Sequence, residues 1–319
     1  MMRIVGLLLF GWALVSGPAA ADYPEKAVRI VLPYAAGGGA DFLTRVIAEK
    51  LSEKWRQPVI VDNKPGAGAT LGADMVAKAA PDGYTLLMTA GTMAVSPSAY
   101  AKLPYDVLRD FAAITPVASS PFMLALRSAL PAASLSALIA AAQAKPGSLN
   151  FGSAGNGTMS HLSIELLKVR AQIAVEHVPY KGSNPALNGL LGGEVDAVFD
   201  TPAALMPHVA SGKLRGLAVT TPARSASAPD VPTMTEAGVA DCVVTVWFGL
   251  LAPAGTSAAV IAKVHADTLE ALGRPDVAPR FATQGLEIVT MRPEAFGAFI
   301  REEVDKWAAV VRAARIKFD

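Results

Sequence analysis

The stretch that decides the fold class is VRIVLPYAAGGGADFLTRVIAEKLSEKW, residues 28–55. Its first five residues, Val28–Leu32, are mostly apolar and predict a strand, which Pro33 and a run of three glycines bring to an end. Residues 41–55 then place apolar side chains at helical spacing, namely Phe42, Val46, Ile47, Leu51 and Trp55. The stretch therefore predicts a strand, a glycine loop and a helix, which is the first half of a βαβ unit.

The same alternation continues along the chain in two series. The first predicts strands at 59–61 and 84–88 around a helix at 70–79. The second begins near Pro121 and predicts strands at 122–126, 149–151, 175–178, 195–199 and 214–220, with helices at 135–143, 159–169 and 185–191. A return strand at 243–251 and helices at 258–272, 277–284 and 293–314 close the chain. Such alternation predicts an α/β fold with mostly parallel sheets, and 319 residues are enough for two lobes.

Bulk composition narrows the classes of function. Hydrophobic residues make up 52% of the chain and charged residues 17%, which is typical of a globular protein with a large core. The formal net charge is +1 and no basic run stands out, so neither nucleic acid nor an anionic membrane surface is an expected partner.

The N-terminus has the pattern of a secretory signal. Arg3 precedes an apolar stretch at 4–15, and small residues follow up to Ala21. We therefore expect residues 1–21 to be a signal peptide, cleaved before Asp22, and the mature chain to be exported. A membrane anchor is the alternative, but the stretch is shorter than the ~18–20 apolar residues that a span needs. No later stretch is long and apolar enough either, so we do not expect a membrane-embedded protein.

No catalytic or metal-binding set can be assembled from the sequence. The one cysteine, Cys242, cannot form an internal disulfide and is expected to be a small buried residue. No serine lies in a G-x-S-x-G elbow. None of the four histidines forms an i,i+4 metal pair; they are His161, His177, His208 and His265. We expect no catalytic residue, no metal and no cofactor.

The glycine loop at 33–41 has the features of an anion site. Its glycines let the backbone approach a ligand, and the next helix presents unpaired N–H groups and the positive end of its dipole. Asp41 is expected to cap this helix and to pair with Arg45 one turn on. An ordinary flexible connection is the alternative.

A second run of glycines, at 66–72, does not match a dinucleotide fingerprint. Its third glycine falls one residue late for G-x-G-x-x-G, and Pro65 occupies the position of the tight turn. We interpret this run as a helix-entry loop.

Another glycine-rich loop, at 153–161, joins a strand to a helix in the second series. Its backbone amides and the hydroxyl groups of Ser153, Thr158 and Ser160 could bind a further part of a ligand. His161 has no acidic partner at helical spacing in this interpretation, and its alternative role is a helix-start residue that bonds backbone or water.

Two further residues are candidates for the ligand cleft. Lys181 is placed either at the rim of a cleft or in a surface turn. Asp200 follows a strand, at the edge where open α/β sheets bind ligands, but it could equally be a helix cap.

The chain resembles the Bug (TctC-like) family, the extracytoplasmic solute receptors of tripartite tricarboxylate transporters. The matching text covers nearly the whole mature chain and includes the loop at 33–41, DNKPGAG at 62–68, APDGYTLL at 80–87, LPYD at 103–106, 153–162, HVPYKG at 177–182, GKLRGLAV at 212–219, PDVPT at 229–233 and WFGLLAPAGT at 247–256.

This resemblance implies a two-lobed periplasmic binding fold (type II-like) that closes on a small organic carboxylate. We expect lobe 1 to comprise 22–121 and 218–319, and lobe 2 to comprise 122–217. In the family, loops matching 34–41 and 153–161 hold a ligand carboxylate through backbone amides and water. The implied ligand-binding residues are Tyr34, Ala36, Gly37, Gly38, Gly39, Ala40, Asp41, Thr89, Gly91, Ser153, Ala154, Gly155, Gly157, Thr158, His161, Lys181 and Asp200.

Ala40 stands where the family more often has Thr, and Met159 stands where a small hydroxylated residue is common, so the identity of the ligand stays open. The implied partners are the permease subunits of a tripartite transporter, and the receptor is expected to be a monomer. Two alternatives remain: a receptor that presents its ligand to a membrane sensor, and an exported hydrolase or lyase that uses His161 or Asp200.

Overall fold

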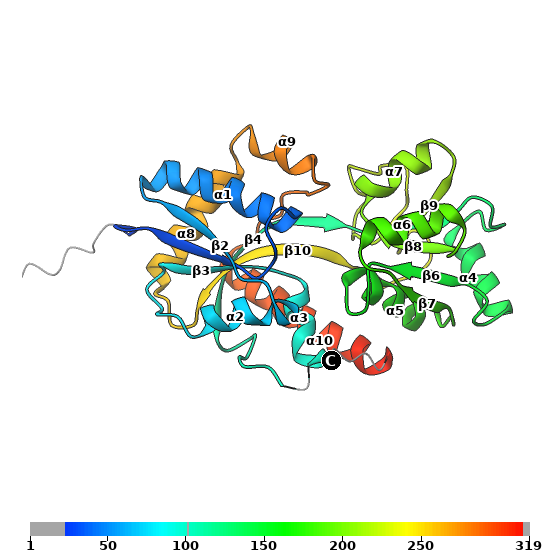
Figure 1. Cartoon of the computed structure of the whole chain (residues 1–319), viewed down its shortest axis with the longest axis horizontal. Helices are drawn as coiled ribbons and strands as arrows, with labels where there is room; N and C mark the ends of the chain where they lie inside the picture. The colour runs from blue at the N-terminus through cyan, green and yellow to red at the C-terminus, as the bar shows by residue number, and fades with distance from the viewer. Residues whose placement is uncertain (1–22, 101, 315–319) are drawn as a thin grey trace, which may run out of the picture.

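The computed structural model describes residues 23–100 and 102–314. The expected signal peptide at 1–21 and its cleavage site before Asp22 lie outside these residues. Within them the chain forms two lobes, each built on a five-stranded sheet with helices packed against it (Figure 1). The expected two-lobed α/β fold is confirmed.

The first lobe contains a mixed sheet with the strand order β2-β1-β3-β10-β4. Here β1 (Val28–Leu32) is parallel to β2 (Val59–Asn63) and β3 (Thr85–Ala90), while β10 (Thr245–Pro253) is antiparallel to β3 and to β4 (Phe111–Pro121). The helices are α1 (Gly39–Trp55), α2 (Thr70–Ala77), α3 (Thr92–Ala99), α8 (Ala258–Leu272), α9 (Val277–Ala282) and α10 (Pro293–Ala314), with a 3₁₀ turn η1 (Ala67–Ala69) ahead of α2.

The second lobe repeats this plan with the order β7-β6-β8-β5-β9. Here β6 (Asn150–Ser153) is parallel to β7 (Glu176–Pro179) and β8 (Ala197–Asp200), while β5 (Met123–Arg127) is antiparallel to β8 and β9 (Leu214–Val219). Its helices are α4 (Leu135–Ala144), α5 (Met159–Ala171), α6 (Ser183–Gly192) and α7 (Pro202–Ala210). Both sheets are mixed rather than mostly parallel, because β10 in the first sheet and β5 in the second run antiparallel to both of their neighbours.

Alternation along the strands explains the two-sided packing of the first lobe. Ile30 belongs to the core formed with α1 and α8, whereas its neighbour Val31 belongs to the core formed with α2, α3 and α10. Successive side chains of a strand point to opposite faces, so a run of buried apolar residues such as β1 needs helices on both sides.

The lobes are joined where β4 leads into β5 and where the chain returns through β10. Phe122 N–H donates to Thr220 Oγ1 at 3.1 Å, and Thr220 Oγ1 donates to the carbonyl oxygen of Val244 at 2.5 Å. Because β9 extends to Val219, the division expected at 217 falls inside a strand of the second sheet.

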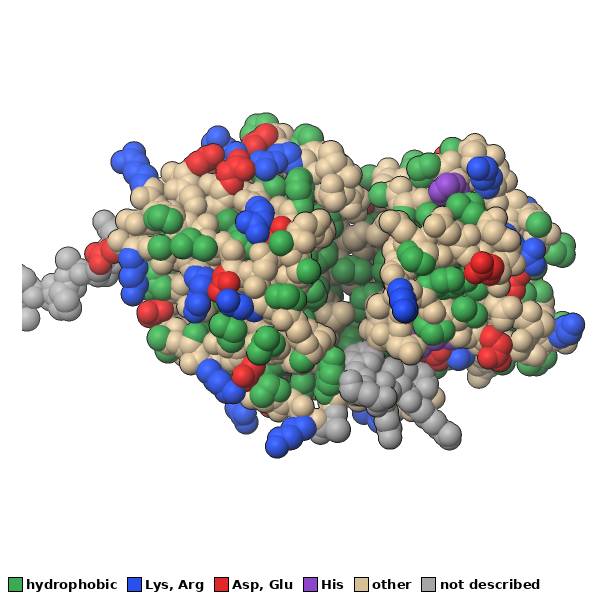
Figure 2. All heavy atoms as spheres, in the orientation of Figure 1, with side chains coloured by type: hydrophobic (Ala, Val, Ile, Leu, Met, Phe, Trp, Pro, Cys, Tyr) green, Lys and Arg blue, Asp and Glu red, His purple; other side chains and the backbone are tan. Residues whose placement is uncertain are grey.

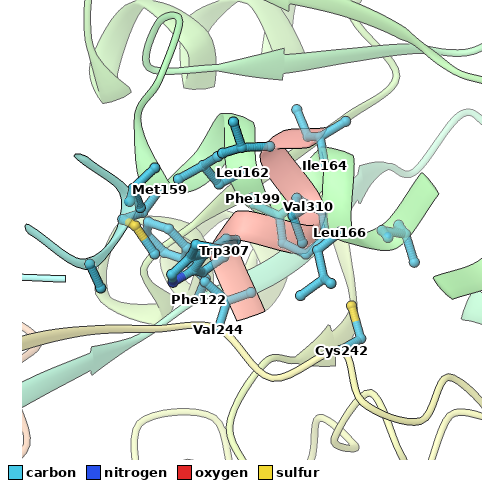
Figure 3. Packing of buried hydrophobic residues seen from close by; sticks show 14 of the residues in the cluster. Phe122, Met159, Leu162, Ile164, Leu166, Phe199, Cys242, Val244, Trp307 and Val310 are labelled. Atoms are coloured by element: carbon cyan, nitrogen blue, oxygen red, sulfur yellow. The ribbon is translucent and has the colours of Figure 1, made fainter. Parts of the chain in front are cut away.

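One hydrophobic cluster extends through both lobes. Trp307 of α10 is fully buried and lies among Leu162 of α5, Phe199 of β8 and Val244 ahead of β10 (Figure 3). The C-terminal helix of the first lobe thus packs against the second. Among the described residues, no helix has both the length and the apolar character that crossing a membrane requires.

Candidate functional site

The lobes face each other across a cleft whose walls are loops that follow strands. Figure 2 shows the surface hollowed between the two lobes. A cavity of about 660 Å³ is lined by Pro33, Tyr34, Ala35, Pro65, Gly66, Gly68, Ala69, Thr92, Ser96, Tyr100, Asn156, Gly157 and Thr158. The lining residues thus lie in the segments that come after β1, β2, β3 and β6 in the sequence. The carboxyl ends of parallel strands from both sheets therefore point toward the cavity, as is common in open α/β folds.

Helix N-termini from both lobes contribute to the wall of this cavity. Its wall contains residues of the loops that lead into α1, α2 and α5, together with the first residue of α3. The first N–H groups of each helix have no acceptor within the helix, and the dipole makes that end positive. Of the described residues that line the cavity, none is Asp, Glu, Lys, Arg or His. The site can therefore attract an anion through backbone dipoles and hydroxyl groups.

Asp41 fixes the first glycine loop from behind. Its carboxylate accepts hydrogen bonds from Gly37 N–H (3.0 Å), from Arg45 Nε (2.9 Å) and from Asn63 Nδ2 (3.0 Å). The Arg45 guanidinium, with smaller contributions from the Gly37 and Asn63 donors, lowers the pKa of Asp41 to about 2. The pairing with Arg45 is as expected, but the helix begins earlier than predicted and Gly38, not Asp41, is its N-cap.

Tyr34 connects the first loop to α3. Its hydroxyl group is 3.0 Å from Thr92 Oγ1, and burial raises the pKa of Tyr34. Thr89 is buried in β3, and Gly91 N–H donates to the carbonyl oxygen of Trp247 at 3.0 Å. A β-carbon at Gly91 would lie 3.2 Å from Trp247 Nε1, so a glycine suits this close approach.

The second glycine loop is held largely by its own side chains. Thr158 caps α5 by accepting from His161 N–H, and its hydroxyl group donates to the Gly155 carbonyl oxygen at 2.7 Å. Ala154 N–H donates to Ser160 Oγ at 3.0 Å, Gly155 N–H to Ser153 Oγ at 3.1 Å, and Gly157 N–H to His161 Nδ1 at 3.0 Å. Several backbone amides that the sequence predicted as ligand donors thus form hydrogen bonds within the loop.

His161 has an acidic neighbour that the sequence analysis missed. Glu165 lies one helical turn on, and its Oε1 is 3.8 Å from His161 Nε2, so the expectation of no partner at helical spacing was wrong. The His161 ring also stacks on the His177 ring, with centroids 3.9 Å apart. Burial lowers the pKa of both rings to about 4, so both are neutral near pH 7.

Asp200 and Lys181 do not line the cavity. Asp200 is buried at the end of β8, where it accepts hydrogen bonds from Ser183 Oγ and from Thr201 N–H (2.7 Å). Burial raises the pKa of Asp200. The side chain of Lys181 is exposed.

The structure brings Tyr34, Gly157 and Thr158 of the expected residues to the cavity wall, while Asp41 and His161 support the loops from behind. Which of them contact a ligand stays a prediction. Pro33, Ala35 and Asn156 lie in the two loops that the sequence predicted as binding loops, although they were not singled out there. The sequence pattern did not predict the other lining residues, which are Pro65, Gly66, Gly68, Ala69, Thr92, Ser96 and Tyr100. A usable signal was the glycine run after β2, which was interpreted only as a helix entry although it follows a strand parallel to β1.

The Ser153 hydroxyl group, 2.6 Å from His177 Nε2, does not form an accessible nucleophile. Ser153 is 1% exposed, and its oxygen already accepts the Gly155 N–H. Among the described residues, no group of three or more His, Cys, Asp or Glu side chains is arranged to hold a metal ion.

Comparison with known proteins agrees with this architecture. The sequence model of the family described as "TctC: Tripartite tricarboxylate transporter family receptor" matches residues 43–316. The chain is 38% identical to Protein BugT of Bordetella pertussis over 320 residues, which covers 99% of this chain and 98% of BugT.

Two ligand-bound structures are also similar. MatC from Rhodopseudomonas palustris with bound malate is 33% identical, with a TM-score of 0.72 over 91% of this chain and 100% of MatC. A second R. palustris protein, with adipate, is 32% identical, with a TM-score of 0.75 over 93% of this chain and 99% of that protein. The chain therefore belongs to the TctC (Bug) family of periplasmic solute-binding receptors of tripartite tricarboxylate transporters, which are receptors rather than enzymes.

Proposed function

We propose that this protein captures a small organic carboxylate in the cleft between its lobes and delivers it to the membrane subunits of a tripartite transporter. The observation that supports this most directly is the cavity wall, which combines the N-terminal ends of helices from both lobes with an absence of acidic side chains among its described residues. Relatives with about the same fold hold malate and adipate.

A carboxylate suits this wall because its oxygens accept hydrogen bonds and its charge is favoured at helix N-termini. The loops ahead of α1 and α5 belong to different lobes, so one carboxylate that contacts both is bound better when the lobes are close together. A ligand shifts such an equilibrium only by its differential affinity for the two forms. Closure on the solute then changes the surface that a membrane subunit meets.

The size of the cavity agrees with a small solute. Its volume of about 660 Å³ lies within the range of roughly 300–1,000 Å³ that is usual for small-molecule sites. Tyr34, Ser96 and Tyr100 add hydroxyl groups on the side of the first lobe, where they can bind the part of the solute beyond its first carboxylate.

The test is a binding screen on ligand-free protein. The mature chain is unfolded in guanidinium chloride, washed and refolded to remove copurified solute, and then titrated by calorimetry with malate, adipate, citrate, aspartate and benzoate. Glucose and putrescine are the neutral and cationic controls. We expect saturable binding of at least one acid and of neither control. A protein that binds glucose or putrescine but none of the acids contradicts the proposal.

Delivery to a transporter is tested separately from binding. The loaded receptor is mixed with detergent-solubilised permease subunits of a tripartite transporter or with the ectodomain of a membrane sensor kinase. Retention by the permease only in the presence of the acid supports transport. Retention by the sensor ectodomain alone replaces transport with signalling and leaves the proposed ligand class intact.

A further inference from the structure

Two stacked imidazoles lie behind the second glycine loop, outside the cavity wall. His161 comes from the first turn of α5 and His177 from β7, and the planes of their rings are 6° apart. Neither ring is among the residues that line the cavity, although Gly157 and Thr158 beside them are. The pair is therefore placed to support the loop rather than to contact a solute.

Each ring is connected to an N–H group of the loop. His161 Nδ1 accepts the hydrogen bond of Gly157 N–H at 3.0 Å. His177 Nε2 is 2.6 Å from Ser153 Oγ, and that oxygen accepts from Gly155 N–H at 3.1 Å. The two rings thus fix the glycines on either side of Asn156, which lines the cavity together with Gly157 and Thr158.

The direction of the Gly157 hydrogen bond sets the protonation of His161. Because Nδ1 accepts, it carries no proton, and the neutral ring holds its proton on Nε2, which faces Glu165 Oε1 at 3.8 Å. Lys168 Nζ donates to the same Glu165 oxygen at 2.9 Å. The positive charge of Lys168 lowers the pKa of both rings, and the negative charge of Glu165 raises the pKa of His177.

We propose that His161, supported by the stacked His177, is a positioning residue for the ligand, because its unprotonated Nδ1 holds Gly157 and thereby orients Asn156 and the N-terminus of α5 toward the cleft. This inference rests on the proposed function of the cleft. Protonation of Nδ1 would set two N–H groups against each other, so the loop must move when His161 becomes charged. The neutral ring is the form that keeps the loop in place.

Two substitutions distinguish the effect of the hydrogen-bond acceptor of His161 from the effect of its ring. His161→Phe keeps an aromatic ring for His177 to stack on and removes the acceptor, whereas His161→Asn keeps an acceptor near the position of Nδ1 and removes the ring. With malate and adipate as probes at pH 7, we expect H161F to bind about tenfold more weakly than wild type, the effect of one lost hydrogen bond. We expect H161N to bind within about threefold of wild type. His208→Leu, a histidine change on α7 of the same lobe, is the control and should bind like wild type.

A second measurement needs no ligand. In ¹⁵N NMR spectra of the ligand-free protein between pH 7 and pH 3.5, the Gly157 amide of wild type should follow the titration of His161, and in H161N this transition should be absent. If H161F does not fold, the Gly157 amide titrations of wild type and H161N still decide whether His161 holds this amide.

The inference is wrong if H161F binds like wild type, if H161N is as weak as H161F, or if the Gly157 amide titrates in the same way in wild type and H161N. Failure of the proposed function has a different signature. Wild type then binds neither malate nor adipate, while the amide titration still reports whether His161 holds the loop.

Discussion

At the scale of single residues, the two glycine loops at the cleft depend on side chains that are not part of the cavity lining. Asp41 accepts a hydrogen bond from the N–H group of Gly37, and His161 accepts one from the N–H group of Gly157. Glycine makes these turns possible but does not fix them, because it loses more conformational freedom on folding than any other residue. The neighbouring polar side chains supply the missing constraint.

Asp41→Asn should therefore weaken the fold in a pH-dependent way. The pKa of Asp41 falls from 3.8 to about 2 on folding, so its ionised form contributes stability that is fully present above pH 3.8 and is lost as the pH falls toward 2. We expect the variant to lose about 1–3 kcal/mol of unfolding free energy at pH 7, the cost of disturbing a buried charged hydrogen-bond partner. The difference from wild type should shrink below pH 4.

Urea unfolding at pH 7 and pH 3 measures this, with Asp62→Asn as the control. Asp62 pairs with Arg29 at 3.6 Å and with Lys64 at 3.1 Å near the surface, and such pairs contribute about 0–1 kcal/mol. Equal unfolding free energies of D41N and wild type at pH 7 would show that Asp41 does not hold the loop.

Residue types alone did not assign these roles. The sequence placed Asp41 and His161 at helix starts, next to glycines, and therefore near the cleft. It predicted the pairing of Asp41 with Arg45, but it could not show that Asn63 also donates to Asp41, because Asn63 lies at the end of β2 and only the pairing of β2 with β1 brings it beside α1. The same holds for His177, which meets His161 because β7 lies beside β6. The Glu165 partner of His161 could have been predicted, since its i,i+4 spacing is visible in the sequence.

At the scale of elements, sequence periodicity predicted the strands and helices that carry a clear apolar pattern. The bounds of β1, α8 and α10 agree with the predicted ranges. The sequence pattern predicted neither β4, α3 nor α7. Pro97 lies inside α3 and Pro207 inside α7, and an internal proline removes a helical hydrogen bond, so local sequence argues against both helices. Packing overrides this preference in α3, where Met93, Ala94 and Val95 are buried in the core.

The N-terminus of α5 gives an element-scale prediction. Thr158 and Ser257 are both N-caps, of α5 at the cleft and of α8 on the first lobe. Either residue changed to Ala should cost about 1 kcal/mol of unfolding free energy, the usual effect of a lost cap. Only Thr158→Ala should also weaken acid binding in calorimetry. Unchanged affinity in a folded T158A protein would place the start of α5 outside the site.

At the scale of the whole molecule, the lobes share a core as well as a cleft. The cluster around Trp307 includes residues of α10, α5 and β8 (Figure 3). The segments that connect the lobes are also hydrogen-bonded to each other through Thr220. Repetition of the strand and helix pattern predicted two lobes. It could not predict that the last helix of the first lobe packs on the second, since that contact depends on how the lobes are oriented.

This shared core predicts that the lobes unfold together. In hydrogen exchange at increasing urea concentration, peptides from β1 and α1 and peptides from β6 and α5 should lose protection with the same midpoint. Trp307→Ala leaves a cavity at a fully buried site and should lower the free energy of unfolding by about 3–5 kcal/mol. We expect both midpoints to fall as a result. Separate midpoints for the two lobes in wild type would show that the cluster does not couple them.

The proposed function depends on contact of both lobes with one negatively charged group of the solute. A crystal structure of the refolded protein with the tightest-binding acid of the panel tests it most directly. We predict that one carboxylate of the solute lies within hydrogen-bond distance, directly or through one water, of the loops at 34–41 and 153–158. A solute that is bound through only one lobe, or whose carboxylate points away from both glycine loops, would contradict the account.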